Sequence, residues 1–119
     1  MGTIRLGMEF SIDYAHKLEG HPTCGRDHGH TARIIVEVEG SLGRGEGYRA
    51  HMVLDYKELK EQVRRVLDTL DHRNLNELFE YPTSENICRW IFDELSKSLK
   101  VTRVTFYEGE GKWCTVERD

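Results

Sequence analysis

The chain has 119 residues, of which 38% are hydrophobic and 32% charged, and its formal net charge is -4 at pH 7. This length predicts one domain over residues 1–119, and no apolar run is long enough for a membrane span. The seventeen Lys and Arg residues are scattered rather than clustered, which argues against a nucleic-acid surface.

Two strands are predicted in the first third of the chain. Apolar residues occupy every second position from Ile4 to Ile12, which is the period of a strand with one buried face. The segment from Lys17 to Asp27 contains glycine and proline and predicts a loop, after which the alternation returns from Ala32 to Val38. Four glycines between Gly40 and Gly47 predict a turn, and a short extended stretch should follow from His51 to Leu54.

The first of two predicted helices runs from about Tyr56 to Leu70. Asp55, with Glu58 three residues later, resembles a capping box, in which each side chain bonds the backbone N–H of the other residue. The apolar residues that follow have helical spacing and predict one buried stripe.

A second helix and a closing hairpin are predicted in the last third. The helix should begin after Pro82, with Thr83 or Ser84 as its N-cap, and end near Lys100. Residues 101–117 alternate again on both sides of a glycine-rich turn, which indicates two strands joined as a hairpin.

The predicted order of elements is strand, strand, helix, helix, strand, strand. This order favours an α+β domain in which an antiparallel sheet carries two helices on one face. The other face would be left to solvent or to a partner, and a chain of this size often completes its ligand site with a second subunit.

The N-terminus and the cysteines predict a cytoplasmic protein. Residues 1–5 have neither the apolar core of a secretory signal nor the Arg-rich and Ser-rich character of a transit peptide. Cys24, Cys88 and Cys114 are odd in number and unevenly spaced, which is a poor disulfide framework and suits reduced thiols. We expect Cys88 and Cys114 to be small buried side chains.

Three histidines form the strongest candidate site. His28 and His30 share the parity of the apolar residues of their strand, so both should face the core, where an unpaired imidazole is costly. His16 shares the parity of the first strand, and antiparallel pairing could bring it beside the other two. Three imidazoles suit zinc and leave a fourth position open for water or substrate. The alternative is a coincidental pair of surface histidines.

Cys24 lies in the predicted loop, four residues before His28. A thiolate there could act as a base or a nucleophile beside a metal ion. It could instead be a fourth zinc ligand that closes a structural site, and the spacing leaves both readings open. His21 and His51 are expected to be exposed and without a special role.

Two further groups carry candidate chemistry. Asp71 and His72 directly follow the first helix, and an irregular turn there would let the carboxylate orient an imidazole for proton transfer. The alternative for this pair is helix capping. Glu108 has the parity of the apolar residues of its strand, so its carboxylate could face the core and accept paired N–H donors of a ligand. The alternative for Glu108 is an exposed turn glutamate.

Several stretches combine into one resemblance. They are Phe10-Ser-Ile-Asp-Tyr-Ala-His16, Cys24-Gly-Arg-Asp-His-Gly-His30, Met52-Val-Leu-Asp-Tyr56, Leu70-Asp-His72, Pro82-Thr-Ser-Glu-Asn86 and Glu108. Together they resemble the 6-pyruvoyl-tetrahydropterin synthase family over nearly the whole chain. The resemblance implies roles by position: zinc ligands His16, His28 and His30, a base at Cys24, a triad completed by Asp71 and His72, a pterin anchor at Glu108, and pterin contacts at Thr83 and Ser84.

The resemblance also implies a fold and a reaction. Family members adopt the tunnelling fold, in which trimers close their sheets into a barrel and two trimers form a hexamer with active sites between subunits. The implied substrate is 7,8-dihydroneopterin triphosphate. The short spacing from Cys24 to His28 looks like the queuosine branch, which makes 6-carboxy-5,6,7,8-tetrahydropterin and acetaldehyde. The alternative is the biopterin branch, which makes 6-pyruvoyl-tetrahydropterin.

Two departures from the family pattern accompany the resemblance. His51 stands where a glycine often precedes the Met-Val segment, and Gly109 follows Glu108 where threonine is common. Outside enzymes, the remaining alternative is a non-catalytic oligomeric module that zinc stabilises.

Overall fold

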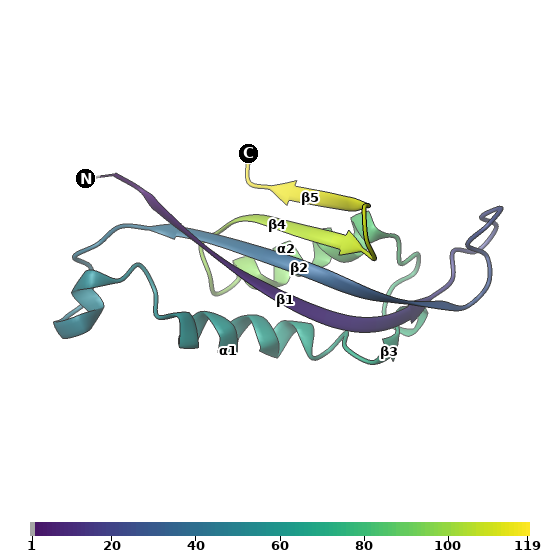
Figure 1. Cartoon of the computed structure of the whole chain (residues 1–119), viewed down its shortest axis with the longest axis horizontal. Helices are drawn as coiled ribbons and strands as arrows, with labels where there is room; N and C mark the ends of the chain where they lie inside the picture. The colour runs from purple at the N-terminus through teal and green to yellow at the C-terminus, as the bar shows by residue number, and fades with distance from the viewer. Residues whose placement is uncertain (1) are drawn as a thin grey trace.

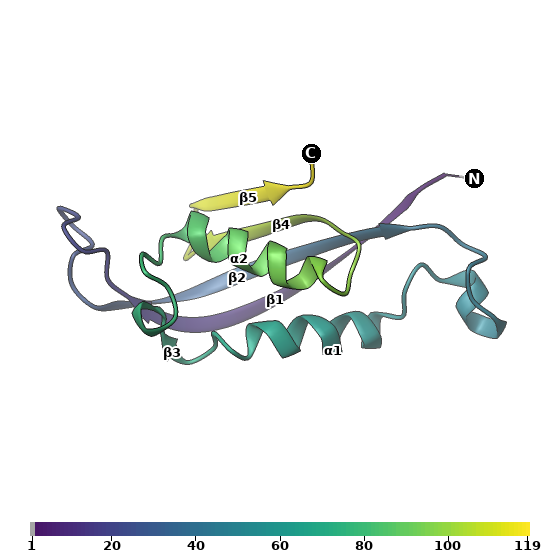
Figure 2. The same cartoon turned by 180° about the vertical axis from the view of Figure 1, so that it is seen from behind.

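The computed structural model describes residues 2–119 and consists of one twisted sheet with helices on one side (Figures 1 and 2). The strands are β1 (Ile4–His16), β2 (His28–Gly40), β3 (Arg73–Asn74), β4 (Val101–Glu108) and β5 (Trp113–Glu117). The helices are α1 (Tyr56–Leu67) and α2 (Ser84–Ser96), and the short 3-10 helices are η1 (Gly47–His51) and η2 (Leu75–Glu77). This order agrees with the predicted one, with β3 and the two 3-10 helices added.

The sheet has the strand order β3-β1-β2-β4-β5. β1 and β2 form a long antiparallel hairpin whose register runs from Ile4 opposite Gly40 to His16 opposite His28. The prediction of a wholly antiparallel sheet was wrong at one edge, because β3 pairs with β1 in parallel, with Tyr14 opposite Arg73. The chain reaches this edge from the end of α1, which returns it alongside β1 in the parallel direction.

Helix α1 begins where it was predicted and ends earlier. The Asp55 side chain caps it by accepting a hydrogen bond of 2.9 Å from the backbone N–H of Lys57. The predicted capping box does not form, because the carboxylate of Glu58 pairs with Arg49 of η1 instead. The helix ends at Leu67 rather than Leu70 because the following residues close tighter i to i+3 turns.

The second helix and the closing hairpin agree with the sequence. Thr83 is the N-cap of α2, since its hydroxyl accepts a hydrogen bond of 3.1 Å from Asn86 N–H. The helix ends at Ser96, four residues before the predicted end at Lys100. β4 and β5 pair as an antiparallel hairpin, with Phe106 opposite Cys114.

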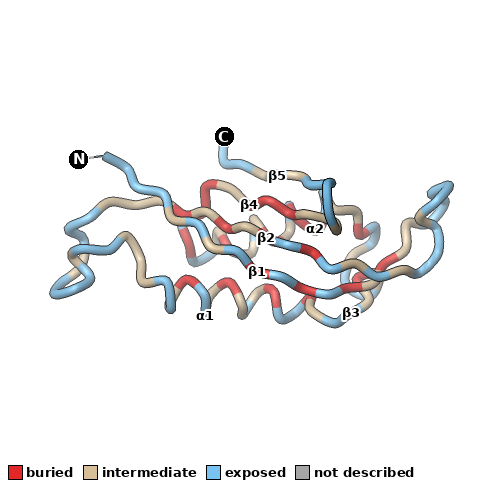
Figure 3. The backbone as a smooth tube through the Cα atoms, in the orientation of Figure 1, coloured by how far each residue is buried: buried red, intermediate tan, exposed pale blue. Residues whose placement is uncertain are grey.

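Alternate side chains of the sheet face the helices and form the core. α2 packs on β4 and β5, and α1 packs against β1 and α2. Figure 3 shows the buried residues alternating along the strands and following one side of α1. The core includes the buried side chains of Phe10, Ile12, Ile34, Val36, Leu59, Val63, Leu67, Leu70, Leu75, Ile87, Ile91, Leu95, Val104 and Phe106. The opposite sheet face, which was predicted to be left to solvent or to a partner, carries the ion pairs of Arg103 with Glu37 and Glu117.

The molecule is long and narrow, with extents of 54 × 25 × 24 Å. η1 lies at one end of the long axis and the loop between β1 and β2 at the other (Figure 1). The extended stretch predicted around His51 to Leu54 is present only in part, because His51 ends the 3-10 helix η1 whereas Met52 has extended backbone angles, and residues 52–54 join no strand. Within residues 2–119, no helix has the length and apolar character needed to cross a membrane.

Candidate metal centre

Three imidazoles meet at the end of the β1–β2 hairpin. The register places His16 directly opposite His28, and His30 lies two residues further along β2 on the same face. Their ring centroids are 4.6 to 5.1 Å apart, and each residue offers a ligand atom within 4.8 Å of the other two. His16 is buried and the other two are partly buried. The structure therefore brings together the three side chains that the parity of the two strands predicted.

Two of the rings are oriented by backbone carbonyls. His16 Nδ1 lies 2.7 Å from the carbonyl oxygen of Pro82, and His28 Nδ1 lies 2.7 Å from that of Arg26. A carbonyl oxygen only accepts, so each Nδ1 carries a proton and Nε2 is the ring nitrogen of each residue that could bind a metal ion. This second set of contacts is typical of metal-binding histidines. Sequence reasoning missed Pro82 and Arg26 because both act through the main chain, where the residue type gives no signal.

His30 completes the donor set. Its Nε2 is buried and has no hydrogen-bond partner. Burial lowers the pKa of His30, and the neighbouring His16 and His28 lower it further against the opposing effect of Glu108. The imidazole is therefore neutral at pH 7 and offers a lone pair. Three imidazoles, one of them with an unsatisfied buried nitrogen, fit a zinc ion, which His16, His28 and His30 would hold.

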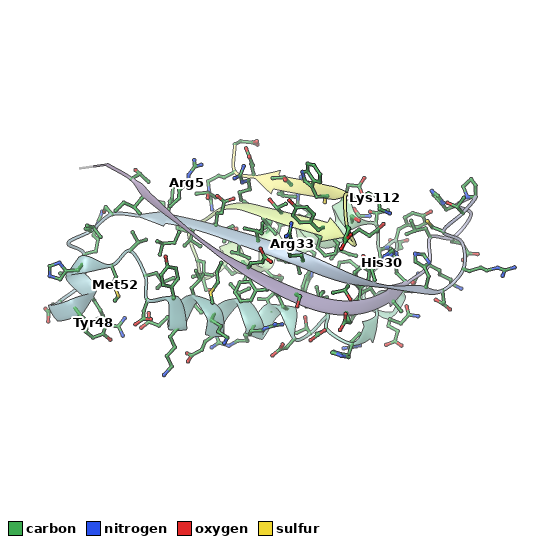
Figure 4. The ribbon with its side chains drawn as sticks, in the orientation of Figure 1. Arg5, His30, Arg33, Tyr48, Met52 and Lys112 are labelled. Atoms are coloured by element: carbon green, nitrogen blue, oxygen red, sulfur yellow. The ribbon has the colours of Figure 1, made fainter. Side chains whose placement is uncertain are left out.

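A carboxylate lies beside the imidazoles. The oxygens of Glu108 are 3.9 Å from both His16 Nε2 and His30 Nε2. Ser84 donates a hydrogen bond of 2.9 Å to Glu108, and Lys112 Nζ is 3.5 Å from its other oxygen. Burial opposes ionisation of Glu108, but the Ser84 hydroxyl, the two histidines and Lys112 outweigh it and lower the pKa of Glu108. Figure 4 shows His30 and Lys112 in the same half of the molecule.

The two residues at the start of α2 differ in what they touch. Ser84 contacts Glu108 and so belongs to the site, whereas the Thr83 hydroxyl is occupied by the helix cap. The reading of Glu108 as an exposed turn glutamate does not fit its side-chain exposure of 19%.

Cys24 lies in the loop next to the site, but its sulfur is outside the group of mutually close ligand atoms. Its nearest polar side-chain contact is Thr23 Oγ1 at 3.7 Å. The backbone holds the loop in place, because Cys24 N–H donates to His21 Nδ1 over 3.0 Å and the Cys24 carbonyl accepts from Leu18 N–H over 2.7 Å. His21 is exposed, as expected, but the expectation that it has no role was wrong.

Asp71 and His72 form a close pair, but not at the imidazole cluster of the same chain. His72 has a φ of 59°, so the turn is irregular as predicted, and its Nδ1 lies 3.0 Å from Asp71 Oδ1. The carboxylate of Asp71 also accepts a hydrogen bond of 2.9 Å from Asp13 N–H, and His72 Nε2 lies 3.8 Å from the Asp13 carboxylate. Asp13 has the opposite parity to His16 on β1, so this cluster lies by the sheet face away from the helices.

A buried phenol borders the three imidazoles. Tyr14 is 4% exposed, and its ring centroid lies 5.1 Å from that of His16 and 5.6 Å from that of His30. Burial raises the pKa of Tyr14, and the charges of Glu108 and Cys114 add to the effect, so the hydroxyl keeps its proton. Sequence patterns do not single out Tyr14, because an aromatic residue at a core position is ordinary.

Comparison with known proteins gives consistent results. A family model described as 6-pyruvoyl tetrahydropterin synthase matches residues 5–119. The chain is 42% identical over 114 residues to a protein of Archaeoglobus fulgidus that is provisionally named 6-carboxy-5,6,7,8-tetrahydropterin synthase, with 95% of each chain covered. It is 41% identical over 86 residues to the dihydroneopterin monophosphate aldolase of Pyrococcus furiosus, covering 69% of this chain and 70% of that protein.

Among solved structures, the fold is similar to that of Caenorhabditis elegans 6-pyruvoyl tetrahydropterin synthase. The TM-score is 0.85 with 26% sequence identity, and the match covers 100% of this chain and 98% of that chain. The similarity therefore extends over the whole described chain, including the ends of β1, β2 and β4 that carry the candidate site.

Proposed function

Because the chain belongs to the 6-pyruvoyl tetrahydropterin synthase family, we propose that it converts 7,8-dihydroneopterin triphosphate to 6-carboxy-5,6,7,8-tetrahydropterin. The reaction consumes one water and releases acetaldehyde and triphosphate, and its product would serve queuosine biosynthesis. The observation that carries the proposal is the cluster of three imidazoles with the Glu108 carboxylate 3.9 Å from two of them. This arrangement offers a metal site and a ring-binding group side by side.

Glu108 is the proposed anchor for the pterin ring. An ionised carboxylate can accept two parallel N–H bonds from the amino-pyrimidine edge of a pterin. Ser84 already donates to one oxygen and so fixes the orientation of the carboxylate. Thr83 was also expected to contact the pterin, but its hydroxyl accepts from Asn86 N–H and its backbone N–H and carbonyl are bonded to Tyr81 and Ile87.

The imidazole cluster is the proposed zinc site. When bound by His16, His28 and His30, zinc supplies a Lewis acid that polarises oxygens of the substrate side chain. Cys24 is the proposed base that takes a proton from the adjacent carbon, since it is a free, partly exposed thiol in the loop that joins His16 to His28 and is not part of the ligand cluster. A free thiol also leaves the fourth ligand position open.

Asp71 and His72 are proposed to act on the site of a neighbouring subunit. In their own chain they lie by the sheet face opposite the imidazole cluster, although the 3.0 Å contact is suited to orienting an imidazole for proton transfer. We therefore propose a cytoplasmic homo-hexamer of two trimers, with barrel-forming sheets of the tunnelling fold and sites completed between chains.

Mixed oligomers test whether Cys24 and His72 of one active site come from different chains. We expect inactive Cys24→Ala and inactive His72→Ala chains, when co-expressed with different tags and purified together, to recover activity in about a quarter of their sites. Each recovered site would combine Cys24 of one chain with His72 of another. Mixed oligomers that stay as inactive as the two parents would show that both residues serve one chain.

Two other reactions have specific support. The structural similarity to a 6-pyruvoyl tetrahydropterin synthase favours elimination of triphosphate to a pyruvoyl pterin. The 41% identity to a dihydroneopterin monophosphate aldolase favours aldol cleavage of the monophosphate to a hydroxymethyl pterin and a phosphorylated two-carbon aldehyde. We place 6-carboxytetrahydropterin synthesis first because that relative is matched over 95% of the chain rather than 69%.

Product analysis separates the three reactions. The zinc-loaded protein would be incubated with 7,8-dihydroneopterin triphosphate and, separately, with the monophosphate, and the products identified by mass spectrometry with a coupled acetaldehyde assay. We expect carboxylated pterin and acetaldehyde in equal amounts from the triphosphate. A pyruvoyl pterin without acetaldehyde, or turnover of the monophosphate alone, would replace the proposal with the corresponding alternative.

The anchor role of Glu108 predicts a selective defect. Glu108→Gln removes the charge that strengthens two ligand hydrogen bonds, so kcat/KM should fall about 10- to 100-fold while zinc content is unchanged. Steady-state kinetics and metal analysis of the same preparation would measure both quantities. Glu110→Gln, at the exposed turn of the same hairpin, is the matched control and should retain wild-type kcat/KM.

A further inference from the structure

Tyr14 occupies the fourth corner of a block whose other corners are the three imidazoles. On β1 it precedes His16 by two residues, and across the hairpin it lies directly opposite His30. His28 lies opposite His16 and completes the block. All four side chains face the helices, because they share the parity of the core residues of their strands.

The hydroxyl of Tyr14 has no partner. Over residues 2–119, the only buried side-chain nitrogen or oxygen atoms without a hydrogen bond are Tyr14 Oη and His30 Nε2. Buried polar groups in folded proteins are nearly always paired, because removing them from water without a replacement bond is costly. Both unpaired atoms belong to residues of this one block, so a single occupant could satisfy both.

Phenylalanine would fill the same space without this cost. The Tyr14 ring packs beside His16, His30 and Phe106, with centroids 5.1, 5.6 and 5.9 Å away, and these contacts need no hydroxyl. An unpaired buried hydroxyl therefore destabilises the fold, and this cost is offset when a bound group accepts its hydrogen bond. A metal ion would bind the unpaired Nε2 of His30, whereas the protonated phenol of Tyr14 needs a hydrogen-bond acceptor.

We propose that the Tyr14 hydroxyl is a positioning donor that hydrogen-bonds an oxygen atom, from water or from a substrate hydroxyl, held among the three imidazoles. This inference rests on the proposed zinc site. The acceptor is small, because the hydroxyl is enclosed, and it is an oxygen because the fourth position of a three-histidine zinc site takes water or an oxygen of the substrate. Tyr14 thus acts as an outer-sphere hydrogen-bond donor. The Pro82 and Arg26 carbonyls differ from it because they accept hydrogen bonds, from His16 and His28.

The test compares Tyr14→Phe with Tyr56→Phe, which removes an exposed hydroxyl. Thermal unfolding midpoints would be measured for metal-free and zinc-loaded protein, and zinc affinity by competition with a chromophoric chelator. Tyr14→Phe should raise the midpoint of the metal-free protein and weaken zinc binding about tenfold, so the stabilisation by zinc shrinks. Tyr56→Phe should change neither quantity.

The outcomes are distinct. The proposal would be overturned if Tyr14→Phe shifts the unfolding midpoint equally with and without zinc and leaves zinc affinity unchanged. The hydroxyl would then make no contact that depends on the metal. A lower midpoint of the metal-free variant would also overturn it, since the hydroxyl would then have a partner within the protein. In cobalt-loaded protein, a visible spectrum changed by Tyr14→Phe but not by Tyr56→Phe would support it. Failure of the unsubstituted protein to bind zinc would instead refute the metal site itself.

Discussion

Cys24→Ala is expected to keep one zinc ion per chain and to lose turnover by about 10²- to 10⁴-fold, the usual contribution of a positioned general base. The reason is that the Cys24 sulfur stands outside the group of close ligand atoms formed by the three histidines. Zinc would be counted by atomic absorption on the purified oligomer. Turnover would be followed as the release of triphosphate.

This result would also decide between an enzyme and a structural module. If zinc content falls with Cys24→Ala and the protein unfolds on chelation, the thiol is a fourth ligand and the site has no open position. Cys114→Ala is the control, since it also removes a partly buried thiol but from β5, and it should retain both zinc and turnover.

His28→Ala is expected to abolish stoichiometric zinc binding and all measurable turnover. Removing one of three ligands leaves two imidazoles that hold zinc at least about 100-fold more weakly, more than the loss from an outer-sphere substitution. The β1–β2 pairing depends on backbone bonds and on core residues away from His28, so the variant should remain folded. Zinc titration and circular dichroism would measure the two properties.

The matched control is His51→Ala. His51 is an exposed histidine, whereas His28 is partly buried, and His51 lies in η1 at the opposite end of the long axis. Its substitution should leave zinc content unchanged. Retention of one tightly held zinc by His28→Ala would refute the three-histidine site.

The alternation of the sequence was enough to place the imidazoles on one face. It was not enough to fix which residues lie opposite each other, because parity leaves the register of two strands open by any even number of residues. The pairing of His16 with His28 depends on how the loop between them closes, through contacts such as Leu18 N–H to the Cys24 carbonyl. Such contacts are set by the folded loop rather than by residue type.

Competition between contacts explains the other differences. Asp55 and Glu58 have the spacing of a capping box, but Glu58 pairs with the guanidinium of Arg49 in η1 instead of the backbone N–H of Asp55. A charge-assisted hydrogen bond is stronger than one from a neutral backbone N–H. β3 was missed because two residues are too few to show a period. Asp71 and His72 were correctly expected in an irregular turn, but the sheet face they approach follows from tertiary packing against Asp13.

The turn that leads into α2 touches both halves of the site. The Pro82 carbonyl fixes the His16 ring, and two residues later the Ser84 hydroxyl fixes the Glu108 carboxylate. A displacement of this single turn would therefore disturb the proposed zinc ligand His16 and the proposed pterin anchor Glu108 together, so the proposed affinities for zinc and for pterin should be interdependent. For the proposed enzyme, thermodynamic reciprocity then requires that any factor by which zinc raises the affinity for pterin is also the factor by which pterin raises the affinity for zinc.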